Sequence, residues 1–145
     1  MEEGTPDSDI VSIEPDLAGA VFAVHLASQM LDKAREDFSR KDYSGALEES
    51  RNAMRMASSA IMLKNGHLTG SLDSTIAYLS SSYPGRFPLR SWYVAETTTI
   101  AKGGGLYGAL IKAIGRTTRN LEQEASDAIN AADRFLDAIR MEMGQ

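Results

Sequence analysis

Apolar residues recur every three or four positions in three long stretches of this sequence, and this spacing constrains the fold more than any other feature. A side chain returns to the same side of an α-helix at that interval, so each stretch predicts one helix with a single apolar face. The clearest stretch covers residues 42–64, where we expect Asp42 to cap a helix and Asn65-Gly66 to end it. Its predicted inner face contains Leu47, Ser50, Met54, Ala57, Ile61 and Lys64, with Ala46, Ala53 and Ala60 beside them.

The other two long helices are predicted at the two ends of the chain. The first starts near Pro15, which suits an initial helical turn, and the last is capped by Asn120. The apolar positions of the first are Leu17, Val21, Val24, Ser28, Leu31, Ala34 and Phe38. Those of the last are Leu121, Ala125, Ala128, Ala132, Phe135, Ile139 and Met143. Because about four residues join the first two helices, these must lie antiparallel and side by side.

Shorter elements are predicted between the second and last long helices. Thr69 or Ser71 is expected to cap a short helix that Pro84-Gly85 ends, and residues 89–101 are assigned as helix although β-branched residues compete with that assignment. Residues 106–114 are expected to form a short helix or a packed loop. The sequence therefore predicts an all-α, up-and-down antiparallel bundle of about five helices. We expect residues 15–145 to form one domain, after an acidic, flexible tail over residues 1–14.

Composition narrows the class of protein. The chain has 145 residues, 43% of them hydrophobic, and contains no cysteine. It has no apolar run near the roughly 20 residues that span a bilayer and no basic start followed by an apolar stretch. We therefore expect a soluble, cytoplasmic protein without a membrane segment, disulfides or cysteine metal sites. Neither a metal site nor a cofactor is predicted.

Charge is distributed unevenly along the chain. The formal net charge is −5, yet residues 86–119 contain six basic residues against one acid, Glu96. These six are the candidates for binding an anion or nucleotide: Arg86, Arg90, Lys102, Lys112, Arg116 and Arg119. Trp92, Tyr93 and Tyr107 lie among them, and phosphate attraction with base stacking is typical of single-stranded nucleic acid sites. The alternative is intramolecular, with these cations neutralising acids of the first and last helices.

Several segments together resemble a known family. They are Leu31-Asp32-Lys33-Ala34, then Lys41-Asp42-Tyr43-Ser44-Gly45-Ala46, then Leu63-Lys64-Asn65-Gly66, and the terminal helix from Glu124 to Ile139. On these residues the chain resembles the HEPN domain family over roughly residues 17–140. Tyr43, Ala46 and Ala53 also suit a tetratricopeptide repeat, but nothing recurs at that repeat's period of about 34 residues.

The resemblance implies a helical bundle, frequent homodimers, and roles in RNA cleavage, nucleotide binding or pairing with a minimal nucleotidyltransferase in toxin–antitoxin systems. Ribonuclease members of the family carry an Arg about four to six residues before a His, which places both side chains on one helical face. Neither His25 nor His67 has such an Arg, and the expected region reads Lys102-Gly103-Gly104-Gly105-Leu106-Tyr107. No catalytic residue is therefore assigned.

Four other polar residues are candidates for function. We expect His25 to be a partly buried structural residue and His67 to bond carbonyl groups at a helix end. Arg51 and Arg55 lie one turn apart. They are expected to pair with Glu48 and Glu49 on a solvated face, or else to hold phosphate across a dimer groove.

Three functions remain open from the sequence. The first is a noncatalytic HEPN-like binding or assembly module, forming a homodimer and engaging a nucleotide, RNA or a nucleotidyltransferase. The second is an atypical, toxin-type ribonuclease in which Arg116, Arg119 or Tyr107 replaces the missing pair. The third is a purely structural helical protein that docks through the apolar residues 106–114.

Overall fold

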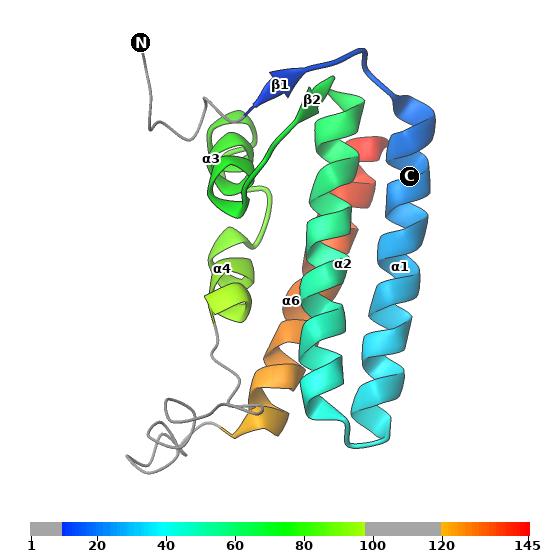
Figure 1. Cartoon of the computed structure of the whole chain (residues 1–145), viewed down its shortest axis with the longest axis vertical. Coiled ribbons are helices and arrows are strands. Elements are labelled where there is room, and N and C mark those ends of the chain that lie inside the picture. The colour runs from blue at the N-terminus through cyan, green and yellow to red at the C-terminus, as the bar shows by residue number, and fades with distance from the viewer. Residues whose placement is uncertain (1–9, 98–119) are drawn as a thin grey trace.

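The protein is a bundle of α-helices with one small two-stranded ribbon (Figure 1). The computed structural model describes residues 10–97 and 120–145, and within them five helices are present. Three long helices run side by side: α1 (Leu17–Ser39), α2 (Tyr43–Lys64) and α6 (Leu121–Met143). The shorter α3 (Leu72–Ser82) and α4 (Leu89–Thr97) follow one another along α2, on the side away from α1. The predicted all-α helical bundle is confirmed.

The turn between α1 and α2 is held by two aspartates. Asp42 caps α2 as predicted, because its carboxylate accepts a hydrogen bond from the Gly45 amide at 3.0 Å. The Asp42 amide in turn donates to the carbonyl of Asp37 at 2.8 Å. The Asp37 carboxylate is buried and accepts from Lys33 Nζ at 2.9 Å, which raises the pKa of Lys33. These contacts fix the antiparallel arrangement of the two helices.

Small side chains dominate the contact between α1 and α2. Alanines are four of the seven buried residues of α1 and four of the ten buried residues of α2, and small residues at a contact let two helix axes approach closely. The buried alanines are Ala20, Ala23, Ala27 and Ala34 in α1, and Ala46, Ala53, Ala57 and Ala60 in α2. Larger side chains fill the region between α2, α4 and α6. There, Phe135 lies against Phe87 and Trp92, with ring centroids 5.5 and 5.0 Å apart.

The predicted inner face of α1 is wrong at the start of the helix. Leu17 is 60% exposed and Val21 also faces solvent, while Ala20 and Ala23 are buried. At the start of α1 the alanines pack against α2. The apolar spacing in the sequence does not show whether an alanine lies on the inner or the outer side of a helix. Helix α6 runs antiparallel to α1, because Asp133 contacts Arg35 and Arg140 contacts Ser28.

The segment before α1 contains a short strand that the sequence pattern did not indicate. Strand β1 (Val11–Ser12) pairs antiparallel with β2 (His67–Leu68), the segment that follows α2. The Ile13 amide also donates to the carbonyl of Gly66 at 2.8 Å. Residues 11–13, which were expected to belong to the flexible tail, are thus held by backbone hydrogen bonds. Strands of two residues are too short to show an alternating apolar pattern.

Gly66 combines two constraints, and its replacement by alanine should be costly. Its φ is +79°, and a Cβ atom there would lie 2.8 Å from the Ile13 carbonyl oxygen. Gly85 provides a matched control, because its φ is +73° but no atom lies within 4 Å of its Cβ position. We expect Gly85→Ala to lower the unfolding free energy by about 1 kcal/mol and Gly66→Ala by on the order of 2 to 3 kcal/mol. Urea denaturation measures the unfolding free energy of each variant. Equal decreases in the two variants would show that β1 can move away from residue 66 without a loss of stability.

Candidate functional site

Two of the six predicted anion-binding residues, Arg86 and Arg90, lie in the described part of the chain. Arg86 is exposed and forms an ion pair with Glu142 of α6, as the intramolecular alternative predicts. Arg90 is exposed in the first turn of α4. The other four are Lys102, Lys112, Arg116 and Arg119, which lie outside the described residues, as does Tyr107.

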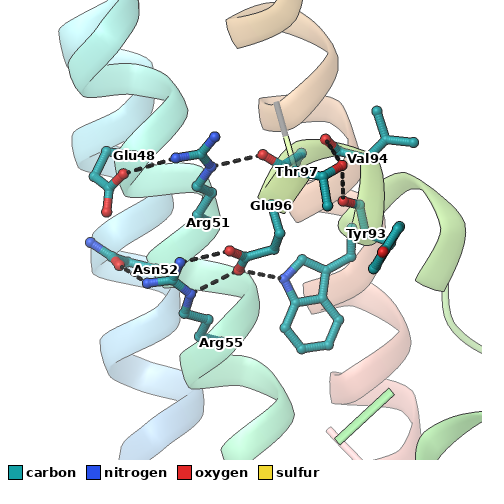
Figure 2. Close-up of polar contacts among 10 residues, drawn as sticks. Glu48, Arg51, Asn52, Arg55, Tyr93, Val94, Glu96 and Thr97 are labelled. Atoms are coloured by element: carbon teal, nitrogen blue, oxygen red, sulfur yellow. Dashed lines mark hydrogen bonds and ion pairs between the residues drawn. The ribbon is translucent and has the colours of Figure 1, made fainter. Parts of the chain in front are cut away.

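The aromatic pair Trp92-Tyr93 is divided between the two sides of α4. Trp92 is only 1% exposed and packs edge-on against Phe135. The expectation that Trp92 stacks on a ligand is therefore wrong, since its ring belongs to the core. Tyr93 is 49% exposed. Figure 2 shows its ring on the side of α4 away from α2. Because Arg90 lies one turn earlier on the helix, Arg90 and Tyr93 share a face of α4.

The inner side of α4 carries a buried carboxylate held by an arginine of α2 (Figure 2). Arg55 donates to both oxygens of Glu96, from Nη2 at 2.6 Å and from Nε at 2.8 Å. The indole Nε1 of Trp92 donates to the same carboxylate at 3.0 Å. The Glu96 side chain is only 6% exposed, so three donors compensate for the burial of its charge. The hydrogen bond to Glu96 raises the pKa of Arg55, against the opposite effect of burial.

A second arginine of α2 holds the end of the same helix. Arg51 Nε donates to the carbonyl oxygen of Ala95 at 2.7 Å, and its Nη1 lies 3.2 Å from Glu48 (Figure 2). A cation beside the last carbonyl groups of a helix is favourable because those groups carry partial negative charge. We call Arg51, Arg55, Trp92 and Glu96 the clasp.

The clasp corrects the sequence-based expectation for Arg51 and Arg55. Only the Arg51–Glu48 contact matches the predicted pairing on a solvated face, and both guanidinium groups bind α4 instead of an open groove. The clasp also changes how the charge of Glu96 is interpreted. In the net charge of residues 86–119, Glu96 is the one acid set against the six basic residues. In the structure its charge is paired with Arg55, away from Arg90.

A further arginine reaches α4 from α6. Arg134 is exposed, and its Nη2 lies 3.3 Å from Oγ of Ser91, the residue after Arg90. Acids nearby on α6 are engaged by other basic residues: Asp133 by Arg35, Asp137 by Arg140 and Glu142 by Arg86. Within residues 10–97 and 120–145, neither Arg90 nor Arg134 forms an ion pair. We call Arg90 and Tyr93 the α4 face. Arg134 is not part of it, because Ser91 lies about 160° around the helix from Tyr93. The charge pattern pointed to Arg90.

The two histidines lie on different elements. His25 is exposed on α1, with Nε2 3.3 Å from Gln29 Nε2, so its predicted partial burial is wrong. His67 lies in β2 and contacts the ring of Tyr78 edge-on, with centroids 5.1 Å apart, instead of bonding helix-end carbonyls. Within the described part of the chain, no group of three or more His, Cys, Asp or Glu residues is arranged to hold a metal ion.

Among the described residues, no helix has the length and apolar character needed to cross a membrane. Comparison of the chain with models of known protein families, with curated proteins and with solved structures found no match. The resemblance to HEPN domains therefore rests on the sequence segments quoted above.

Proposed function

We propose that this protein is a noncatalytic, HEPN-like binding module whose α4 face binds a phosphate-bearing ligand, either a nucleotide or RNA. One observation supports the proposal above all. Arg90 and Tyr93 are both exposed on one face of α4, and Arg90 forms no ion pair among the described residues. The other described arginines, apart from Arg134, pair with acids: Arg35, Arg40, Arg51, Arg55, Arg86 and Arg140.

The chemistry of the α4 face suits such a ligand. A guanidinium group donates two parallel hydrogen bonds to phosphate oxygens, and its charge persists at any working pH. An exposed tyrosine ring offers a flat surface for a base, and such stacking tolerates any base because each has a π-face. Since the whole chain carries a net charge of −5, attraction of an anion has to come from a local site such as this one.

The α4 face predicts which variants lose binding. A labelled single-stranded RNA and ATP are titrated in low salt against the wild type, Arg90→Ala, Tyr93→Ala and Arg40→Ala. Arg90→Ala should weaken RNA binding and flatten the dependence of log K on log salt by about 0.7, the value for one phosphate contact. Tyr93→Ala should cost about 1 to 3 kcal/mol of binding free energy with an unchanged slope. Arg40 is exposed but paired with Glu36, so Arg40→Ala is the control.

The same titration decides against the proposal if the wild type gives no saturable signal with either ligand. It also addresses the alternative of an atypical ribonuclease.

We expect the RNA to be recovered at full length after incubation. Cleavage that disappears in Arg116→Ala, Arg119→Ala or Tyr107→Phe would favour the ribonuclease instead.

Association is a separate part of the proposal and rests on the family resemblance. We propose that the module forms a homodimer or pairs with a nucleotidyltransferase. Light scattering over a wide concentration range tests the homodimer. The third alternative, docking through residues 106–114, concerns residues outside those that the structure describes.

A further inference from the structure

Helix α4 depends on its neighbours for its position. It has nine residues, and isolated helices shorter than about 12 to 15 residues are marginal in water. Only Trp92 and Ala95 of this helix are buried. Besides these two, Leu89 is the only apolar residue of α4 packed against the core, so few side chains fix the direction of the outer residues Arg90 and Tyr93. Directional contacts are needed to fix how α4 is turned about its own axis.

The clasp supplies such contacts. The guanidinium group of Arg55 donates to both carboxylate oxygens of Glu96, an arrangement that we call the fork. Two parallel hydrogen bonds fix the relative orientation of the two groups, whereas a single hydrogen bond does not. Arg51 holds the carbonyl of the preceding residue, Ala95, at 2.7 Å. Both arginines come from one long helix, α2, so they form a rigid support. Any rotation of α4 that turned Tyr93 and Arg90 would break these bonds.

We propose that Arg51 and Arg55 are positioning residues for the α4 face, an inference that rests on the proposed function. They touch no ligand. They hold α4 in the orientation in which Arg90 and Tyr93 bind phosphate and base together. An apparent dissociation constant rises in inverse proportion to the fraction of molecules in the competent state. Loss of the clasp therefore weakens binding by lowering that fraction and leaves the ligand contacts themselves unchanged.

The test separates positioning from charge. The double variant Arg55→Met with Glu96→Gln removes the fork but keeps the net charge of the wild type. Arg55→Lys keeps the positive charge but replaces the fork by a single ammonium group. Each is titrated with the same labelled single-stranded RNA across a range of salt, with Arg90→Ala alongside. The emission of Trp92, the only tryptophan in the chain, reports the clasp directly because its indole donates to Glu96.

We expect the double variant and Arg55→Lys to bind RNA about tenfold more weakly, with the salt slope of the wild type, and their Trp92 emission to shift to longer wavelength. Arg90→Ala, in contrast, should flatten the slope and leave Trp92 emission unchanged. Circular dichroism shows whether each variant retains its helices.

Several results would overturn the inference. Wild-type affinity in a variant whose Trp92 emission has shifted would show that the clasp does not position the face. Unchanged Trp92 emission in the double variant would show that the clasp does not hold α4. A flattened salt slope in Arg55→Lys or the double variant would make Arg55 a ligand contact. Absence of RNA binding by the wild type would refute the proposed function and remove the site to be positioned, a result distinct from the first three.

Discussion

Phe135→Ala is expected to lower the unfolding free energy by roughly 3 to 5 kcal/mol. Phe135 is fully buried in α6 and lies against the rings of Phe87 and Trp92, which come from the segment around α4. Truncation leaves a cavity at the point where α2, α4 and α6 meet, and the two neighbouring rings lose their packing surface. Chemical denaturation followed by circular dichroism measures the change.

Phe22→Ala is the matched control for this substitution. Phe22 is 61% exposed on α1, so the same truncation should change the unfolding free energy by less than about 1 kcal/mol. Similar losses at Phe22 and Phe135 would contradict the placement of the core between α4 and α6.

Ala57→Trp is expected to destabilise the bundle by the opposite route, overpacking. Ala57 is buried in the face of α2 that contributes to the alanine-rich contact with α1. A tryptophan there forces the packed helices apart and should cost roughly 1 to 3 kcal/mol. The melting temperature should fall accordingly.

Ala18→Trp controls for the helix propensity and size of the new residue. Ala18 lies on α1 but is exposed, so its replacement should leave the melting temperature nearly unchanged. An unchanged melting temperature in Ala57→Trp as well would mean that the α1–α2 contact yields easily, contrary to the close packing of its alanines.

Local sequence signals predicted the helices well. Caps act within three residues, so Asp42 and Asn120 marked the starts of α2 and α6 correctly, and of the two candidates for α3, Thr69 and Ser71, the cap is Ser71. Which side of a helix is buried was harder to predict where alanines and larger apolar residues compete. In α2 the predicted face is buried except for its last residue, whereas at the start of α1 the alanines turn inward and Leu17 turns outward.

The candidate site was predictable only in part, because most of its contacts join distant residues. Arg90 was predicted from the basic segment. The bonds from Arg55 to Glu96 and from Arg51 to Ala95 span 41 and 44 residues, and no local pattern marks such partners. The burial of Trp92 follows from the position of Phe135 in another helix, 43 residues later in the chain. Charge counted along the sequence therefore placed Glu96 against the wrong cations.

The α1–α2 pair is closed by backbone hydrogen bonds at both of its ends. At one end the Asp42 amide bonds Asp37, and at the other the Asp16 amide donates to the carbonyl of Leu63 at 2.8 Å. Forming this pair closes only a short turn, so its loop-closure entropy is small. Docking α6 must instead close the long connection from residue 65 to residue 120. Most of the loop-closure entropy of this fold is therefore lost when α6 docks. Burial of the apolar face of α6, which includes Phe135, has to offset that loss.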